Sequence, residues 1–475
     1  MFPIPEKTSF QDLKNPFREK NEQEEEEEHA PDPNSMAAMA SPADSELSPA
    51  LLKVTTHVYR FPLPATKVIA FTKCFADNLG ADETSKTISS MEQAREDLAL
   101  ELASGTPNYT NAVAGAVRYC PLIALVLRSL EKAEEAVYLQ EPLSFTWATG
   151  LGVKPRQDWI TNQAVVWDKC MVLAAQALSF ADTVYNMLED NQGSKFTEAG
   201  LHLRKAAGLF QRLHETELPR WVGETAKAPR LVEVEPTVCE GLVHFCLAEA
   251  QQMAIGKALV GGKTPKTLLA RLCGGVVRML EDSVSSMRKG GSSSAYERLD
   301  SPFLVHIAFQ QSIFKAFAYR FVAENAWAKD QYGIGVAYMA QACKRVEERR
   351  DATSPGLPPL SGPLRNIHQE LHSLQGEFRD LRNSYLRDNN SIYYDPVPEF
   401  DMLDPLPEPV MMMKSLPSEE EPPPTALLSF RPTSSAEADD GGDKPDGTVS
   451  GGPGGEGGGK TDEEIARELH EKLNT

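Results

Sequence analysis

Residues 195–216 read KFTEAGLHLRKAAGLFQRLHET, and apolar side chains recur in them every three or four positions. Leu203, Ala206, Ala207 and Phe210 therefore share one face of a helix with about 3.6 residues per turn. A helix of this length with one apolar face is stable in water mainly when another element covers that face. The stretch predicts one member of a helical array, and the chain continues the pattern on both sides.

Helical periodicity of the same kind runs through most of the chain. Ile88, Met91, Leu98 and Leu102, for example, line one face of an earlier stretch. We expect Pro121 to kink the second helix, because its ring clashes with the carbonyl group four residues before it. The predicted helices lie near 84–103, 108–139, 162–189, 195–216, 236–259, 264–288, 301–328, 331–350 and 361–388.

The segments between the predicted helices indicate how the helices are connected. Short loops such as Asp190–Gly193 favour antiparallel neighbours, so many helices in succession indicate a bundle or a stacked array. No repeat of fixed period is visible, which argues against a regular solenoid. Only Val54–Phe61 (VTTHVYRF) reads as a strand, because it is rich in β-branched and aromatic residues and ends at Pro62. We predict a mainly all-α fold, an irregular right-handed stack of helical hairpins with a small N-terminal β element.

Two polar arms flank the helical body, which we place at residues 51–416. Residues 1–50 are acidic and Pro-rich, and residues 417–475 are acidic and rich in Pro and Gly. Neither composition supplies enough apolar surface to offset the entropy lost on ordering, so both arms are expected to be disordered. Near the end of the second arm, Thr461 and the acids after it would start a short helix over 462–473.

The amino-acid composition excludes some kinds of binding partner and some cellular compartments. The 475 residues include 48 Lys and Arg against 68 Asp and Glu, for a formal net charge of -20. This charge repels nucleic-acid phosphate and anionic lipid, so we expect no nucleic acid as a partner. No apolar run approaches the ~20 residues of a transmembrane helix, and the N-terminus lacks the apolar core of a signal peptide. We therefore expect a cytoplasmic protein without a transmembrane segment.

The residue types used in catalysis and metal binding form no recognisable site. The seven cysteines are scattered without a CxxC pair and lie among apolar neighbours, as reduced core residues do. His368 and His372 are four apart on one predicted helix, but Gln369 occupies the position of the metalloprotease glutamate. Residues 454–461 formally match the phosphate-binding loop GxxxxGK(S/T), yet no strand precedes them. We predict no catalytic, cofactor or metal site, and no enzyme.

Several short stretches of this sequence are similar to characteristic stretches of one known family. The strongest similarity is at the C-terminal end, in residues 388–394 (DNNSIYY), which are followed by Val397-Pro398 and Leu403-Asp404-Pro405. The others are LSFTW at 143–147, the helix from Trp167 through Ala175, Ala206-Ala207 with Phe210-Gln211, and LAEAQ at 247–251. In this order they resemble landmarks of the Bro-one domain family, the Alix-related adaptors of the endosomal ESCRT machinery. The resemblance covers roughly residues 51–416. Without the V-shaped second domain and long Pro-rich tail of Alix, the chain resembles a short single-domain member.

The resemblance implies a boomerang-shaped stack of helical hairpins, similar to tetratricopeptide repeats, without catalysis. It also implies a hydrophobic patch that binds the C-terminal amphipathic helix of an ESCRT-III subunit. Such binding would recruit the protein from the cytoplasm to endosomes, through partners only, for multivesicular-body sorting. Carried over by position, the partner-binding patch falls on Leu268, Leu272 and Ala254, with Arg204 at a basic flanking position. Gly200 stands where the family has an acid, and Ala254 where Alix-like animal members have a bulky aromatic residue.

Leu268 and Leu272 are one helical turn apart, so both fall on one helix face and suit contact with a partner helix. We expect this face to point outward, because a second stripe can serve as the core face: Leu269, Cys273, Val276 and Leu280.

A second hypothesis is a Bro-one-like signalling scaffold, similar to rhophilin, that binds a different partner. Binding of an ESCRT-III C-terminal helix distinguishes the two hypotheses.

Overall fold

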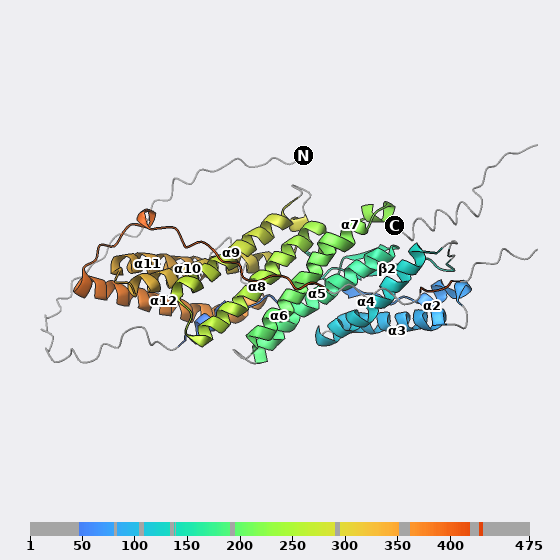
Figure 1. Cartoon of the computed structure of the whole chain (residues 1–475), viewed down its shortest axis with the longest axis horizontal. Coiled ribbons are helices and arrows are strands. Elements are labelled where there is room, and N and C mark those ends of the chain that lie inside the picture. The colour runs from blue at the N-terminus through green and yellow to red at the C-terminus, as the bar shows by residue number, and fades with distance from the viewer. Residues whose placement is uncertain are drawn as a thin grey trace, which may run out of the picture. The chain divides into compact units, whose positions relative to one another are not determined.

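The structure is a computed structural model that describes residues 47–79, 83–103, 109–133, 137, 139–190, 195–289, 295–350, 362–418 and 427–430. They belong to one compact unit, Leu47–Thr475. The predicted arm before residue 47, the phosphate-loop match and the helix predicted over 462–473 lie outside the described residues. The mainly helical fold class is confirmed, since helices lying side by side make up the body and a small sheet accompanies them (Figure 1).

The long helices follow one another in space in their order along the chain. Each packs on the next, from α3 on α4 through to α11 on α12, with the short α7 left out between α6 and α8. Each amphipathic helix thus buries its apolar face against its neighbours. The bounds are α3 Glu83–Ala103, α4 Tyr109–Glu131, α5 Val165–Asp190, α6 Phe196–Arg212, α8 Pro236–Gly261, α9 Lys266–Met287, α10 Ser301–Trp327, α11 Tyr332–Arg350 and α12 His368–Asp388, with short helices α1 Pro49–Thr55, α2 Phe71–Cys74 and α7 Leu218–Arg220.

These bounds agree with the predicted helices to within a few residues, with two exceptions. Helix α4 runs through Pro121 but ends at Glu131, well before the predicted end near residue 139. The stretch predicted as helix from residue 361 begins with a 3-10 helix, Gly362–Ile367, before α12 starts.

The small sheet has the order β1-β2-β3, with β1 Ala65–Thr66, β2 Phe145–Ala148 and β3 Trp159–Asn162. The central strand comes from the LSFTW stretch and pairs antiparallel with both neighbours.

The strand predicted over Val54–Phe61 is wrong, because the first of these residues complete helix α1, Pro49–Thr55. Ser48 caps that helix by accepting a hydrogen bond from a backbone N–H of its first turn (3.0 Å). Beyond the helix, the backbone N–H of Tyr59 donates to the carboxylate of Glu249 (2.7 Å) and not to a neighbouring strand. The β-branched and aromatic side chains of this stretch reflect burial in the core and not strand pairing.

A buried ion pair joins the first helices to the sheet. The guanidinium of Arg95 on α3 lies 2.7 Å from the carboxylate of Asp168 on α5, and neither side chain is exposed. The Tyr119 hydroxyl and the Trp147 indole N–H each donate to Asp168 at 2.7 Å. Arg95 also donates to the hydroxyl of Thr66 on β1. Several elements therefore meet at one carboxylate whose lone pairs and charge are satisfied.

After α12 the chain turns back and crosses the helical array as an extended segment, residues 395–416, which we call the strap (Figure 1). The strap lies against four helices in turn and so links the α11 end of the array to α6. Its hydrogen bonds reach Gly333 and Tyr338 on α11, Arg271 on α9, Gln251 on α8 and Arg204 on α6.

Contacts with the body continue past residue 416, where the sequence analysis placed the start of the tail. The backbone N–H of Leu428 donates to the hydroxyl of Ser129 on α4 (3.0 Å). The ring of Phe430 stacks on that of Phe75, with ring centroids 5.3 Å apart. Residues 427–430 therefore pack against the body, although the acidic and Pro-rich composition around them predicted disorder.

Burial keeps several ionisable groups neutral inside the body. The carboxyl group of Glu249 lies 3.5 Å from Nε2 of His306. Burial raises the pKa of Glu249 well above its ordinary value and lowers the pKa of His306 well below. Burial also lowers the pKa of His57, whose ring centroid lies 5.4 Å from that of His306, to about 4. Burial therefore favours the neutral form of both groups.

One helix of the described chain has the length and apolar composition of a membrane span, where the sequence analysis expected none. It is Thr110–Glu131, and 56% of its most apolar window is buried inside the body. The helix packs between α3 and α5. Its buried apolar side chains, among them Tyr119 and Ile123, form core contacts of the array.

Asp168→Ala should lower the free energy of unfolding by about 3–5 kcal/mol, because it leaves the Arg95 guanidinium buried without a counter-charge. Chemical denaturation followed by circular dichroism measures the change. Asp97→Ala is the matched control: it removes the exposed partner of Arg118 (3.6 Å) and should change stability by less than about 1 kcal/mol. Equal effects of the two substitutions would contradict the role of the buried pair.

Glu249→Gln should stabilise the protein at neutral pH. A carboxyl group whose pKa is raised by folding stays protonated in the folded state, while the unfolded chain ionises above its ordinary pKa of 4.5. The free energy of unfolding therefore falls as the pH rises above 4.5, where the unfolded chain ionises and the folded protein does not. Gln keeps the acceptor for the Tyr59 N–H but does not ionise in the unfolded chain. The variant should melt about 2 °C or more above wild type at neutral pH, and the two should converge near pH 4. A difference independent of pH would mean that Glu249 is charged when folded.

Candidate functional site

Helix α8 lies between α6 and α9, and side-chain contacts fix the register of the three helices. Near the end of α8, the Lys257 ammonium donates to the Thr197 hydroxyl on α6 (2.9 Å). Earlier on α8, the Gln251 side chain donates to the Leu272 carbonyl on α9 (2.7 Å). Ala254 lies between these two contacts. At its level, the beginning of α6 and the first turns of α9 lie on either side of α8.

Three of the four residues predicted to bind a partner come together here, on what we call the α6–α8–α9 face. Leu268 on α9, Ala254 on α8 and Arg204 on α6 are each half-buried. Arg204 holds the strap, because its Nε donates to the Lys414 carbonyl (2.7 Å) and its own carbonyl accepts the Leu416 N–H (3.0 Å).

The expectation that Leu272 faces outward is wrong, because its side chain is only 4% exposed. The strap crosses α9 beside it: the Val410 N–H donates to the Arg271 carbonyl (3.0 Å), and Gln251 donates to the Val410 carbonyl (2.8 Å). Leu268 is one turn farther from this crossing and keeps part of its surface free. Sequence spacing placed both leucines on one helix face, but it could not show that Leu272 is buried near the place where the strap crosses α9.

Three exposed apolar residues at this face escaped the sequence analysis. Leu201 on α6 is 40% exposed and lies one turn before Arg204 on the same side of its helix. Met411 and Met412 on the strap are 53% and 55% exposed, and the Met412 N–H donates to Gln251 (2.8 Å). The run of three methionines at 411–413 was a usable signal, since consecutive apolar residues rarely occur in an acidic, Pro-rich stretch.

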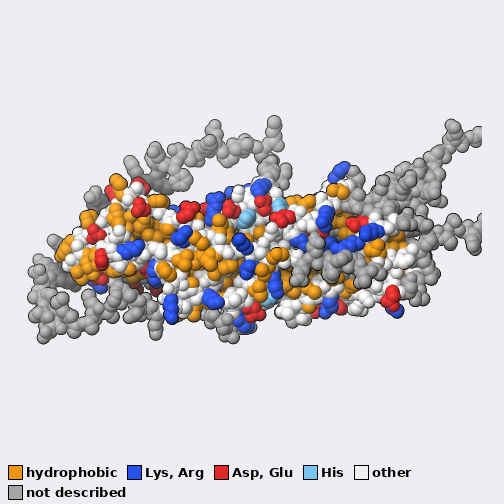
Figure 2. All heavy atoms as spheres, in the orientation of Figure 1, with side chains coloured by type: hydrophobic (Ala, Val, Ile, Leu, Met, Phe, Trp, Pro, Cys, Tyr) orange, Lys and Arg blue, Asp and Glu red, His pale blue; other side chains and the backbone are white. Residues whose placement is uncertain are grey.

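Basic side chains lie beside these apolar residues, together with the exposed acids Glu198 on α6 and Glu408 on the strap. Lys205 and Lys257 are exposed on α6 and α8, and Lys414 is exposed on the strap. Gly200, at the position where the family has an acid, is buried where α6 approaches α8. In Figure 2, hydrophobic and basic side chains lie together along the middle of the molecule, where Figure 1 shows the strap crossing α8 and α9. The arrangement suits an amphipathic helix with acidic side chains.

The cysteines are all buried and unpaired by disulfides. Burial raises the pKa of the Cys170, Cys239, Cys246 and Cys273 thiols, and it raises the pKa of Cys343 to about 11. These groups therefore stay protonated near pH 7, and a protonated thiol is a poor nucleophile and a poor metal ligand.

The histidine pair of the sequence analysis lies on the surface of α12, where His368 and His372 are both exposed. In the part of the chain that the structure describes, no three His, Cys, Asp or Glu side chains gather as metal ligands would.

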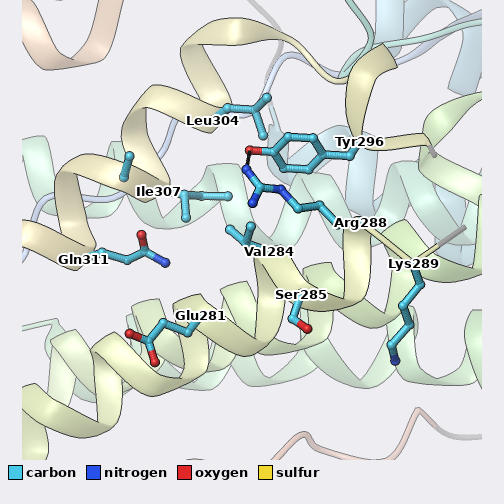
Figure 3. A pocket seen from close by; sticks show the side chains of 10 residues that line it. Glu281, Val284, Ser285, Arg288, Lys289, Tyr296, Leu304, Ile307 and Gln311 are labelled. Carbon is cyan, nitrogen blue, oxygen red and sulfur yellow. Dashed lines mark hydrogen bonds between the residues drawn. The ribbon is translucent and has the colours of Figure 1, made fainter. Parts of the chain in front are cut away.

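A separate cavity of about 580 Å³ lies between α9, α10 and the 3-10 helix Ala295–Arg298 (Figure 3). Its two cations are already engaged, because Arg288 donates to the Tyr296 hydroxyl (3.1 Å) and Lys289 pairs with Glu240 (2.6 Å). None of the four residues predicted to bind a partner lines it. The lining residues are Glu281, Val284, Ser285, Arg288, Lys289, Tyr296, Leu304, Ile307, Ala308 and Gln311.

Comparison with known proteins identifies relatives of this fold. The pH-response regulator protein RIM20 of Yarrowia lipolytica is 22% identical over 301 residues, which make up 61% of this chain and 35% of RIM20. The human tyrosine-protein phosphatase non-receptor type 23 is 22% identical over 216 residues, 46% of this chain and 12% of the phosphatase. The chain thus matches only a minor part of either relative's length.

Solved structures show the same fold. The BRO1 domain of ALIX in its complex with CHMP4C superposes with a TM-score of 0.61 at 18% identity, over 76% of this chain and 96% of that one. A Bro1 domain solved as the structural basis for endosomal targeting superposes with a TM-score of 0.57 at 14% identity, over 76% and 92%. The sequence model of the BRO1-like domain matches residues 51–438, which include nearly all of the helical body. This chain belongs to the family of BRO1-like domain proteins.

Proposed function

We propose that this protein is a non-enzymatic adaptor that binds the C-terminal amphipathic helix of an ESCRT-III subunit on the α6–α8–α9 face. The observation that carries the proposal is the meeting of Leu201, Ala254 and Leu268 on three neighbouring helices, beside exposed methionines and lysines. The similarity to the BRO1 domain of ALIX, solved in complex with CHMP4C, supports the same type of ligand.

The physical form of the face suits an amphipathic helix better than an added β-strand. A strand needs a free sheet edge to pair with, whereas this face is formed by side chains of α6, α8 and α9 and of the strap. The small Ala254 lets a ligand side chain approach α8 closely, while Leu201 and Leu268 flank that position. Met411 and Met412 offer flexible, polarisable contacts that adapt to the ligand's shape.

Binding of this kind would bring a cytoplasmic protein to endosomes for multivesicular-body sorting. The formal charge of -20 disfavours direct adsorption to an anionic bilayer. Recruitment through a partner helix avoids that repulsion.

Leu268→Asp and Leu201→Asp should each weaken binding of a synthetic ESCRT-III C-terminal helix at least tenfold. Each change places a carboxylate where an apolar ligand side chain must pack, at a cost of about 1.4 kcal/mol or more. Isothermal titration calorimetry measures the affinity, and thermal melts of the same proteins report folding. Leu100→Asp is the matched control, because Leu100 is 64% exposed on α3, away from this face.

Lost binding with an intact melt in the two site variants, and normal binding in the control, would support the site. Wild-type affinity in both site variants would remove this face from the interface. Failure of the unchanged protein to bind any ESCRT-III C-terminal helix would favour the scaffold hypothesis with a different partner.

A further inference from the structure

Exposed hydrophobic side chains concentrate at a second place, where the chain leaves α12 and enters the strap. Tyr394 is 74% exposed and Met402 is 80% exposed, and Val397 and Phe400 are each 45% exposed. Soluble proteins scatter single apolar residues over their surface, but a cluster within one short segment indicates a contact site. We call this cluster the 392–402 surface, formed by Ile392, Tyr393, Tyr394, Val397, Phe400 and Met402.

Hydrogen bonds hold the backbone beneath this surface in one conformation. The buried side chain of Asn389 donates to the Asp395 carbonyl (2.8 Å) and accepts the Asp395 N–H (3.1 Å). The Asp395 carboxylate in turn accepts the backbone N–H of Gly333 at the start of α11 (2.8 Å). This clasp forces Tyr394 into the left-handed region, with φ of 52°. A bulky residue rarely adopts that conformation, and here it directs the ring outward.

Aromatic contacts fix the side chains from below. Tyr393 stacks on Tyr332 with ring centroids 3.5 Å apart. Phe400 meets the ring of Tyr319 edge to face at 6.2 Å. The Tyr338 hydroxyl donates to the backbone carbonyl of Asp404 (2.7 Å) and holds the far end of the segment. A surface ordered in advance loses little conformational entropy when a partner binds.

Acidic side chains alternate with the apolar ones along the same segment. Glu399, Asp401 and Asp404 are exposed, and in the described part of the chain none of them forms an ion pair. Hydrophobic and acidic side chains stand together at the left end of the molecule in Figure 2, where Figure 1 places the end of α12 and the start of the strap.

The negative charge of the 392–402 surface favours some binding partners over others. A second copy of this chain docked through the same surface would bring acidic groups against acidic groups. The acidic runs Glu24–Glu28 and Glu419–Glu421 of the chain's own arms are repelled as well. Anionic lipid is disfavoured for the same reason. A positively charged segment with one apolar face satisfies both the exposed rings and the unpaired carboxylates.

We propose that the 392–402 surface docks a basic amphipathic helix of a partner protein. Apolar side chains of that helix pack on Tyr394, Phe400 and Met402, which belong to the residue types that anchor interfaces. Its lysines and arginines pair with Glu399 and Asp401. This site is separate from the α6–α8–α9 face and does not depend on the function proposed for that face. The strap begins at the 392–402 surface and borders the α6–α8–α9 face. The protein would then be an adaptor that binds two ligands at two places along the same segment.

Titration of the full chain with a synthetic amphipathic helix of lysine and leucine, at physiological salt, tests the proposal. The wild-type protein should bind it saturably, and binding should weaken with added salt. Phe400→Ser with Met402→Ser should weaken binding about tenfold, and Glu399→Lys with Asp401→Lys should do the same. Glu399 and Asp401 are exposed, so the melting temperature of their double variant should stay close to wild type. Phe400 also contacts Tyr319, so the melt of the Phe400→Ser, Met402→Ser variant is measured beside its affinity to separate lost binding from lost folding.

The control double variant is Glu96→Lys with Leu100→Ser, an exposed acid and an exposed leucine one turn apart on α3. It should bind the lysine–leucine helix within about twofold of wild type, because one charge reversal and one lost apolar side chain at another place leave the 392–402 surface intact. A peptide with serine in place of leucine should bind far more weakly.

Equal losses in the control and the surface variants would reduce the binding to general charge attraction and overturn the proposal. Unchanged affinity in both surface variants would also overturn it. Binding of phosphatidylserine vesicles that the surface variants abolish would assign the surface to lipid instead. Titration of the same variants with the ESCRT-III helix keeps the two sites distinguishable, since that affinity should not change.

Discussion

The packing of α8 between α6 and α9 is the constraint on which the candidate site depends. Apolar residues occupy nearly every side of α8, so it cannot leave a face to solvent over most of its length. Helix α6 covers one side, α9 covers another and the strap crosses a third through Gln251. Near its C-terminal end, around Lys257, α8 has its exposed residues. The neighbours that bury α8 are therefore the ones that frame the site.

The strap links the packed helices α6, α8 and α9 to the far end of the array. It returns along the array after α12 and bonds to helices far apart in sequence, which makes it both a structural tie and a border of the α6–α8–α9 face. Its start is held by the Asn389 clasp, and its end is held by Arg204. A ligand on either surface would therefore contact a segment that the other surface also uses.

The helices could be predicted from the sequence because the spacing of apolar residues in each amphipathic helix shows which of its faces is buried. Its failures share one physical cause, which is contact with a part of the chain far away. Val54–Phe61 looks like a strand, but its side chains are buried by α8 and α10 and its backbone bonds to Glu249. Leu272 lies on the predicted partner face but is buried beside the strap. The exposure of Leu201 beside the strap methionines became visible only when α6, α8 and the strap were placed side by side, although the methionine run itself was a signal in the sequence.

The claim that most of this account rests on is the use of the α6–α8–α9 face by a partner helix. Amide hydrogen exchange of the full chain, with and without a saturating synthetic ESCRT-III C-terminal helix, tests it without altering any residue. The account predicts slower exchange in α6, in the last turns of α8, in the first turns of α9 and in strap residues 410–416, with α3 unchanged. Slower exchange confined to other helices, or no change at saturation, would contradict it.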